Sequence, residues 1–302
     1  MIKIAVLLTC FNRKEKTISC LRTLFDVLEK YQQTQQDKSK LSVAVFLTDD
    51  GSTDGTSDSV RDEFAGKNIN IIKGTGSLYW AGGMRLAWNA ALEDSVNWDY
   101  FLLLNDDTDL LSNLFEELFV TCEYGYNKYG IRGVVSGIIS AKNDPSKITY
   151  GGDITVNKLT AARKRVYPNG EPIMVDFTNA NILLIHASVV KKIGIFYKGF
   201  RHAHADFDYT NHARKAGIPV LLTGNVCGRC DDDHGTYEDY REKILSMSLR
   251  QRVIFFTNPL HSASDYLCYI RRNAPFRYPF VAIGRFLNIY FPSIYYALFS
   301  KR

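Results

Sequence analysis

The sequence predicts an α/β protein built on a mostly parallel central sheet flanked by helices. Short apolar runs, typical of strands buried on both faces, alternate with segments whose apolar residues recur at helical spacing. Each early strand ends in a loop of small polar and charged residues. Such loops meet at one edge of a parallel sheet, where α/β proteins bind ligands. The chain has 302 residues, 46% of them hydrophobic, so it can form one large domain with an appendage or two modest domains, with a sizeable buried core.

The first half of the chain contains four predicted strands. Strands at residues 2–9 and 41–48 flank a helix, and a third strand follows at 69–73. A helix over about 83–94 precedes the fourth strand at 100–104. Strands that alternate with helices form βαβ units, so these four strands are expected to be mostly parallel.

The pattern changes in the second half of the domain. A helix is expected from near Leu110 to about residue 123, and a strand is expected at 182–185, followed by two helices and a strand that begins near Val220. We therefore expect one domain at 1–236, with halves at 1–109 and 110–236. Between these elements, four short β-prone runs predict a smaller mixed sheet, at 133–139, 148–150, 163–167 and 174–177.

Residues 237–302 are predicted to be a helical C-terminal region, with helices at 238–256 and 262–272 and an aromatic segment at 278–299. Residues 241–302 carry ten Lys and Arg against two Asp and Glu, a net charge of +8, whereas the rest of the chain is −3. Basic, aromatic amphipathic helices lie in the plane of a membrane surface, so we expect this region to bind one. The alternative is that it packs on the domain or forms a homodimer interface.

The cysteines and the apolar segments bear on the cellular location. Six scattered cysteines are typical of reduced thiols in a cytoplasm rather than of a disulfide framework. The apolar run at residues 1–8 is too short for a signal peptide, and Arg285, Asn288 and Pro292 make the last aromatic segment a poor membrane span. We expect a cytoplasmic protein that associates peripherally with the inner face of the cell membrane, and no nucleic-acid partner.

Carboxylates are crowded after the fourth strand, in the run Asn105-Asp106-Asp107-Thr108-Asp109. Carboxylates this close repel one another unless a divalent cation or a basic side chain lies between them. The alternative is structural, because clusters of Asn, Asp and Thr also end strands and cap the helix that follows.

The loops after the first and second strands suit parts of a nucleotide. Thr9, Asn12 and Arg13 can bond a base or a phosphate. Asp49 or Asp50 can accept a hydrogen bond from the ring N–H of a uracil or thymine.

Glycines at the start of the helix before the fourth strand suit the diphosphate. Gly82 and Gly83 would offer backbone N–H groups to it, with Arg85 close behind. Ordinary turn geometry for the glycines and a solvated helix face for Arg85 are the alternatives. Because all these loops converge at one edge of the sheet, the sequence predicts a nucleotide site there.

These motifs resemble glycosyltransferase family 2, which has the GT-A fold. The resemblance is carried by the loop at 9–13, by Asp-Asp-Gly-Ser-Thr-Asp-Gly-Thr at 49–56, and by Asn-Asp-Asp at 105–107. The last run corresponds to the family's Asp-x-Asp motif with Asn105 at its first position, as in the branch that includes rhamnosyl- and galactofuranosyltransferases. Residues 76–83 also resemble that branch's donor-site loop. The resemblance ends near residue 237.

The resemblance implies roles for the acidic residues. Asp49 would hold the pyrimidine, Asp107 would hold a Mn²⁺ or Mg²⁺ ion, and Asp106 would lie near the ribose or the metal. The segment 202–209 resembles the family's Glu-Asp-x-Asp motif with Ala in place of Glu, which makes Asp206 the catalytic base. The alternative is that Asp206 and its neighbour two residues on only cap a helix.

A second candidate metal ligand follows the strand that begins near Val220. Cys227, Cys230 and His234 have zinc-like spacing, but a structural zinc site needs a fourth ligand and there is no second Cys-x-x-Cys pair. By the resemblance, His234 would instead complete the shell of the metal held by Asp107.

The resemblance implies an inverting, metal-dependent glycosyltransferase. Its donor would be a pyrimidine nucleotide sugar, dTDP-rhamnose or a UDP-sugar, and its acceptor a cell-surface glycan on a lipid carrier. A rival is a sugar-phosphate nucleotidyltransferase, which would need a Gly- and Arg-rich loop where residues 9–13 stand. A catalytically inactive glycan-binding or scaffold protein is another rival, and the retained Asp107 and Asp206 argue against it.

Overall fold

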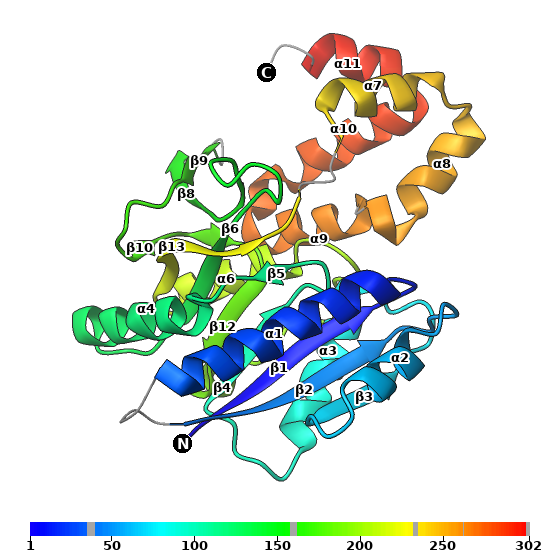
Figure 1. Ribbon diagram of the computed structural model, residues 1–302. Coiled ribbons are helices and arrows are strands. Elements are labelled where there is room, and N and C mark those ends of the chain that lie inside the picture. The colour runs from blue at the N-terminus through cyan, green and yellow to red at the C-terminus, as the bar shows by residue number, and fades with distance from the viewer. Residues whose placement is uncertain (35–39, 158–161, 232–234, 262, 300–302) are drawn as a thin grey trace.

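The computed structural model describes residues 1–34, 40–157, 162–231, 235–261 and 263–299. Its central sheet has the strand order β10-β13-β6-β12-β4-β1-β2-β3, with helices on both faces (Figure 1). The predicted α/β class, with a mostly parallel central sheet flanked by helices, is therefore confirmed.

The first four strands form the wholly parallel part of the sheet, with β1 between β2 and β4 and with β3 at the edge. Successive residues of β1 point into two different apolar clusters, Leu7 into one and Leu8 into the other. Because β1 and β4 are buried on both faces over most of their length, each is a nearly continuous apolar run, and the predicted bounds of all four strands agree with the observed ones within one residue. The strands are β1 (Ile2–Cys10), β2 (Leu41–Asp49), β3 (Ile69–Lys73) and β4 (Tyr100–Leu104).

Two helices begin at residues that the sequence pattern did not predict. The helix α3 (Tyr79–Glu93) begins four residues before the predicted residue 83, because the carbonyl oxygen of Arg201 accepts hydrogen bonds from N–H groups in its first turn. The helix α4 (Leu114–Tyr129) begins after the predicted residue 110, because β5 (Asp109–Leu110) pairs with β13. The other helices of this half are α1 (Lys14–Thr34) and α2 (Thr56–Glu63).

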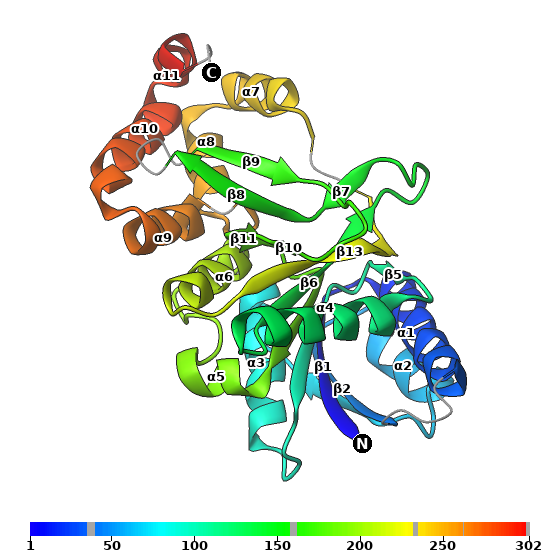
Figure 2. The same ribbon diagram turned by 90° about the vertical axis from the view of Figure 1, so that its left-hand side faces the viewer.

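The second half extends the sheet and adds a small antiparallel one. In the central sheet β12 runs antiparallel to β4 and β6, whereas β6 and β13 are parallel. The small sheet, of order β11-β8-β9, lies beside it (Figure 2). The elements are β6 (Val134–Ser140), β7 (Ile148–Tyr150), β8 (Gly152–Asn157), β9 (Ala162–Val166), β10 (Ile173–Met174), β11 (Phe177–Thr178), β12 (Ile182–His186), α5 (Ala187–Ile193), α6 (Ala205–Lys215) and β13 (Val220–Arg229).

The C-terminal region is helical, as predicted, but more finely divided. The expected single helix at 238–256 is two helices, because the side chains of Ser248 and Gln251 form a capping box that starts a new one. The segment 278–299 is divided before Pro292. The elements are α7 (Tyr237–Ser246), α8 (Leu249–Thr257), α9 (Ala263–Asn273), α10 (Tyr278–Tyr290) and α11 (Pro292–Phe299), with short 3₁₀ turns at Pro259–His261 and Pro275–Arg277.

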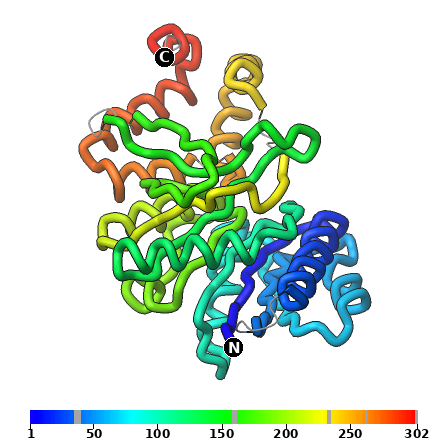
Figure 3. The backbone as a smooth tube through the Cα atoms, turned by 60° about the vertical axis from the view of Figure 1, so that its left-hand side comes forward, coloured from blue at the N-terminus to red at the C-terminus, as the bar shows by residue number. Residues whose placement is uncertain are grey.

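The C-terminal helices differ in how they relate to the domain. The helix α9 packs against α6, where the guanidinium of Arg272 donates to Asp208 at 2.9 Å. The helices α7, α8, α10 and α11 extend away from the sheet, so that α11 and the start of β1 lie at opposite ends of the molecule (Figure 3). Within the described part of the chain, no helix is both long enough and apolar enough to span a bilayer.

Candidate active site

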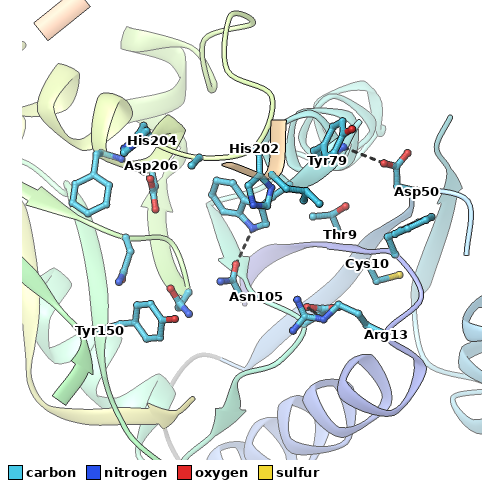
Figure 4. Close-up of a pocket in the computed structure, with 18 of the residues that line it drawn as sticks. Thr9, Cys10, Arg13, Asp50, Tyr79, Asn105, Tyr150, His202, His204 and Asp206 are labelled. Atoms are coloured by element: carbon cyan, nitrogen blue, oxygen red, sulfur yellow. Dashed lines mark hydrogen bonds and ion pairs between the residues drawn. The ribbon is translucent and has the colours of Figure 1, made fainter. Parts of the chain in front are cut away.

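A cavity of about 920 Å³ lies at the carboxyl ends of β1, β2 and β4. Of the residues predicted from the sequence, Thr9, Arg13, Asp106 and Asp206 line it. Asp206 lies on one side and Arg13 on the other, with Asn105 between them (Figure 4). The convergence of loops predicted from the parallel strands therefore takes place, and the second half of the domain closes the cavity.

Other predicted site residues do not line this cavity. They are Asn12, Asp49, Gly82, Arg85 and Asp107. His234 lies outside the described residues.

Asp49 holds the turn that follows β2. One carboxylate oxygen accepts the N–H of Ser52 at 2.8 Å and the other accepts the hydroxyl of Ser57. Burial opposes ionisation of Asp49, but these hydrogen bonds together lower its pKa. Asp49 is therefore an ionised carboxylate that joins the loop after β2 to the first turn of α2.

Asp50 is the residue of this pair that lines the cavity, and it organises the loop before α3. Its carboxylate accepts backbone N–H groups from Gly76 at 2.8 Å, Leu78 at 2.8 Å and Tyr79 at 3.1 Å. Tyr79 has a positive φ of 56°, an unfavourable conformation that these hydrogen bonds help to hold. The segment predicted as a donor-site loop is thus fixed to the end of β2.

Asn12 joins the first two loops to each other. Its side-chain oxygen accepts the N–H of Thr53 at 2.7 Å, and its own N–H donates to the hydroxyl of Ser52 at 2.9 Å. Its φ is 52°. Among the described residues, the positive-φ non-glycine positions are Asn12, Tyr79 and His204, of which Tyr79 and His204 line the cavity and Asn12 lies next to the lining residue Arg13. Such strain is typical of functional sites.

A basic side chain lies between the crowded carboxylates. The Nε of Arg13 is 3.4 Å from Asp106, and its Nη2 pairs with Asp107. Burial raises the pKa of Asp106 to about 7, and Arg13 offsets only part of this shift. The sequence left open whether a divalent cation or a basic side chain lies between the carboxylates, and the structure places the basic side chain of Arg13 there.

The side chains of the described residues show whether the site could bind a divalent metal ion. They include no group of three or more His, Cys, Asp or Glu side chains that could hold one. Mg²⁺, however, is commonly bound by one or two carboxylates together with substrate phosphates. Asp107, whose side chain is 19% exposed against 5% for Asp106, fits that use better than its buried neighbour.

Gly82 and Arg85 brace the loop that precedes α6. The N–H of Gly82 donates to the carbonyl oxygen of Arg201 at 3.3 Å, and Arg85 donates to that of Phe200 at 2.7 Å. Burial lowers the pKa of Arg85. At Gly83 a Cβ atom would lie 2.0 Å from the hydroxyl oxygen of Thr9, so glycine lets α3 pack directly on the end of β1.

Asp206 lies partly buried in the first turn of α6, and it lines the cavity. Burial raises its pKa to about 6, against hydrogen bonds from the N–H groups of Phe207 at 2.8 Å and Ala180 at 3.3 Å. A carboxylate with a pKa near neutrality is suited to general-base catalysis. Asp208 instead faces α9, where Arg272 and Asn273 donate to it.

The side chains of Trp80 and Asn105 form a hydrogen-bonded pair in the cavity that the sequence motifs did not predict. The indole N–H of Trp80 donates to the side-chain oxygen of Asn105 at 2.8 Å. Because an indole is a donor only, this bond fixes the orientation of the carboxamide. Further lining residues that no sequence motif indicated are Tyr150, Arg165, Asn258 and Leu260, the last two from the C-terminal region.

Comparisons with known proteins bear on the family and the fold of the chain. The model of the family described as "Glycosyl transferase family 2" matches residues 5–164, more than half of the chain. None of the curated proteins matches the sequence. The solved structure of S. aureus TarS 1–349 in complex with UDP-GlcNAc is similar with a TM-score of 0.53 and 14% identity, over 100% of this chain and 76% of that one. Another structure of TarS 1–349 has a TM-score of 0.51 and 13% identity, over 96% and 79%. At these identities the likeness shows the fold alone.

Proposed function

The chain belongs to glycosyl transferase family 2 and is a glycosyltransferase, and from this premise we propose that it is an inverting enzyme. It moves a sugar from a pyrimidine nucleotide sugar to a hydroxyl group of a cell-surface glycan on a lipid carrier. The observation that carries the proposal is the position of Asp206, a partly buried carboxylate with a pKa of about 6, across the cavity from the loops that suit a nucleotide. We assign the catalytic domain to residues 1–236, with the donor half at 1–109 and the acceptor half at 110–236.

The donor belongs on the side of the cavity formed by the first strands. Thr9, Arg13 and Asp106 line that side, and Asp49 and Asn12 hold its loops in place. Two donors are proposed. A UDP-sugar is supported by the TarS structure, which contains UDP-GlcNAc, and dTDP-rhamnose by the likeness of the motifs to rhamnosyltransferases.

The transfer needs a base and a counter-charge. Asp206 removes the proton from the acceptor hydroxyl as its oxygen attacks the anomeric carbon, and the nucleoside diphosphate leaves from the opposite face, so the configuration inverts. Arg13 lies where it can bind the diphosphate. We propose Asp107, with His234, as the residues that hold a Mn²⁺ or Mg²⁺ ion. When bound, the ion would offset the charge that builds on the leaving group.

A panel of nucleotide sugars tests the function. With Mn²⁺ or Mg²⁺ present, dTDP-rhamnose or one of a set of UDP-sugars should raise the melting temperature and be hydrolysed slowly to the nucleoside diphosphate. Stabilisation without hydrolysis or transfer to any glycan would favour an inactive glycan-binding protein. Release of pyrophosphate from a nucleoside triphosphate and a sugar phosphate would identify a nucleotidyltransferase instead.

We propose that α10 and α11 bind the inner face of the cell membrane. Their outer surface, which we call the aromatic face, has exposed apolar side chains along both helices and no acidic residue from 266 onward. Exposed apolar patches of this kind mark interaction sites, and the +8 charge of the region favours anionic lipid over another protein surface. The members of the aromatic face are Phe280, Ile283, Phe286, Phe291, Ile294 and Leu298.

Liposome flotation of the intact protein tests the aromatic face. The protein should float with vesicles that contain anionic phosphatidylglycerol, and binding should weaken at high salt because screening removes the electrostatic part. Changing Phe280 and Phe286 together to Ser should weaken binding about tenfold or more, since two aromatic rings no longer enter the interface.

The control changes Val120 and Tyr126, exposed on α4 of the domain, to Ser, and it should bind as the wild type does. A protein that stays in the soluble fraction at low salt would contradict membrane binding. A dimer that dissociates in the Phe280 and Phe286 variant would identify a second copy of the chain as the partner.

A further inference from the structure

A buried carboxylate of the C-terminal region holds a loop of the catalytic domain. Asp265, in the first turn of α9, is 1% exposed. It accepts hydrogen bonds from three consecutive backbone N–H groups, those of Arg201 at 3.2 Å, His202 at 2.7 Å and Ala203 at 2.9 Å. Consecutive N–H groups that point to one spot form an anion-binding concavity. The side chain of Asp265 fills it, and it therefore fixes the path of residues 201–203.

This loop forms part of the cavity wall next to the proposed base. His202, Ala203 and His204 line the cavity, and Asp206 follows in the first turn of α6. His204 has a φ of 64°, and its ring packs against two tyrosines of α9 with centroid distances of 5.5 and 5.6 Å. The strained residue His204 therefore directly precedes α6, and its ring is held by side chains of the C-terminal region.

The same loop also contacts the donor side. The carbonyl oxygen of Arg201 accepts the N–H groups of Ala81 at 3.1 Å and Gly82 at 3.3 Å in the first turn of α3. The short segment from Arg201 to His204 is therefore connected to α3 at one end and to α6 at the other. A shift of this segment would change the distance between the donor loops and Asp206.

We propose that Asp265 is a positioning residue for the transfer reaction. It does not line the cavity, but it holds residues 201–203 so that Asp206 faces the donor loops at the distance the reaction needs. Misplacement of a reacting group by about 1 Å can cost about 10²-fold in rate. The catalytic part of this proposal rests on the proposed function. Its structural part, the fixing of the loop, does not.

The chain offers a matched control at the same helix pair. Asp208 on α6 is also a buried carboxylate at the contact with α9, but its partners are Arg272 and Asn273 rather than the cavity loop. Asp265→Asn and Asp208→Asn each remove one buried negative charge from this contact. Only the first of them touches the residues that line the cavity.

The test uses the full chain and two measurements. Amide hydrogen exchange followed by mass spectrometry on peptides covering residues 197–207 reports how firmly the loop is held. Steady-state release of the nucleoside diphosphate, from the nucleotide sugar that the wild type turns over, gives kcat and KM.

In Asp265→Asn, exchange of the loop amides should accelerate about tenfold or more. Its kcat should fall about tenfold or more, with KM for the donor within about threefold. Asp208→Asn should leave exchange in this peptide close to that of the wild type.

The outcomes separate the two proposals. Equal exchange and equal kcat in the two variants would overturn the role of Asp265. If no nucleotide sugar is turned over by the wild type, the proposed function fails, and the exchange measurement still decides whether Asp265 holds the loop.

Should Asp265→Asn be insoluble, Asp265→Glu takes its place. It keeps the charge but moves the carboxylate by one methylene, so kcat should fall while the protein stays folded. An unchanged kcat in Asp265→Glu would then count against the proposal.

Discussion

Replacing Asp206 with asparagine should lower kcat by about 10²-fold or more while the donor still binds, because an amide cannot accept the proton of the acceptor hydroxyl. The side chain keeps its shape, so the hydrogen bond from the N–H of Phe207 can remain. Binding of the donor is measured by thermal shift with the nucleotide sugar, and kcat is measured by release of the nucleoside diphosphate.

The pH dependence of the wild type gives an independent check. Asp206 must be ionised to act as a base, and burial raises its pKa to about 6. The rate should therefore rise with pH through about 6 and fall about tenfold per pH unit below it. Burial also raises the pKa of Asp106, to about 7, so the variant is needed to assign the titration. The rise should be absent from the residual activity of Asp206→Asn.

Asp208→Asn serves as the control for this experiment as well. The structure places Asp208 at the contact with α9, away from the cavity, so its variant should keep kcat within a few-fold of the wild type. If the loss of turnover appeared in Asp208→Asn and the Asp206 variant were mild, the assignment of the base would be wrong by two residues.

Replacing Asp107 with alanine should abolish transfer, with a loss of about 10²- to 10³-fold or more, because the diphosphate loses the counter-charge that this residue holds. Treatment of the wild type with excess EDTA should have the same effect, and added Mn²⁺ or Mg²⁺ should restore activity. The measurement is kcat for nucleoside diphosphate release before and after chelation.

A nearby carboxylate provides the control. Asp109 is paired with Lys142 at 2.7 Å and belongs to β5, so Asp109→Ala should keep most of the activity. Full activity in excess EDTA would contradict the metal assignment, and with it the role proposed for His234. If Asp107→Ala were inactive under those conditions, Asp107 would act through its pair with Arg13.

The parallel half of the fold could be read from the sequence because its signal is local. The strand β4 has the predicted bounds because all of its residues are buried and apolar or aromatic, and the partly exposed edge strand β3 has the predicted bounds as well. The order of strands and helices then places the polar loops at one edge of the sheet, and the cavity lies there. The motifs in these loops also identified the family, which the family model confirms.

The roles of individual loop residues were less accessible to sequence reasoning. Asp49 and Asp50 are adjacent and chemically identical, yet one bonds to Ser52 and to the first turn of α2 and the other fixes the loop before α3. Crowded carboxylates required a positive partner, and only the tertiary structure places the side chain of Arg13 beside Asp106 and Asp107. These outcomes depend on side-chain directions that composition and spacing do not encode.

By itself the sequence determined the fold class, the family and the meeting of polar loops at the strand ends, because each depends on patterns within a few neighbouring residues. Only the tertiary structure decided that α3 begins at Tyr79, that Asn258 and Leu260 reach the cavity, and that Asp265 holds the loop before Asp206. In the first and the last of these cases the partner is distant in sequence: Arg201 for the start of α3, and Asp265 for residues 201–203. A hydrogen bond across such a separation satisfies a buried polar group without leaving any local pattern, and so it becomes visible only when the chain is folded.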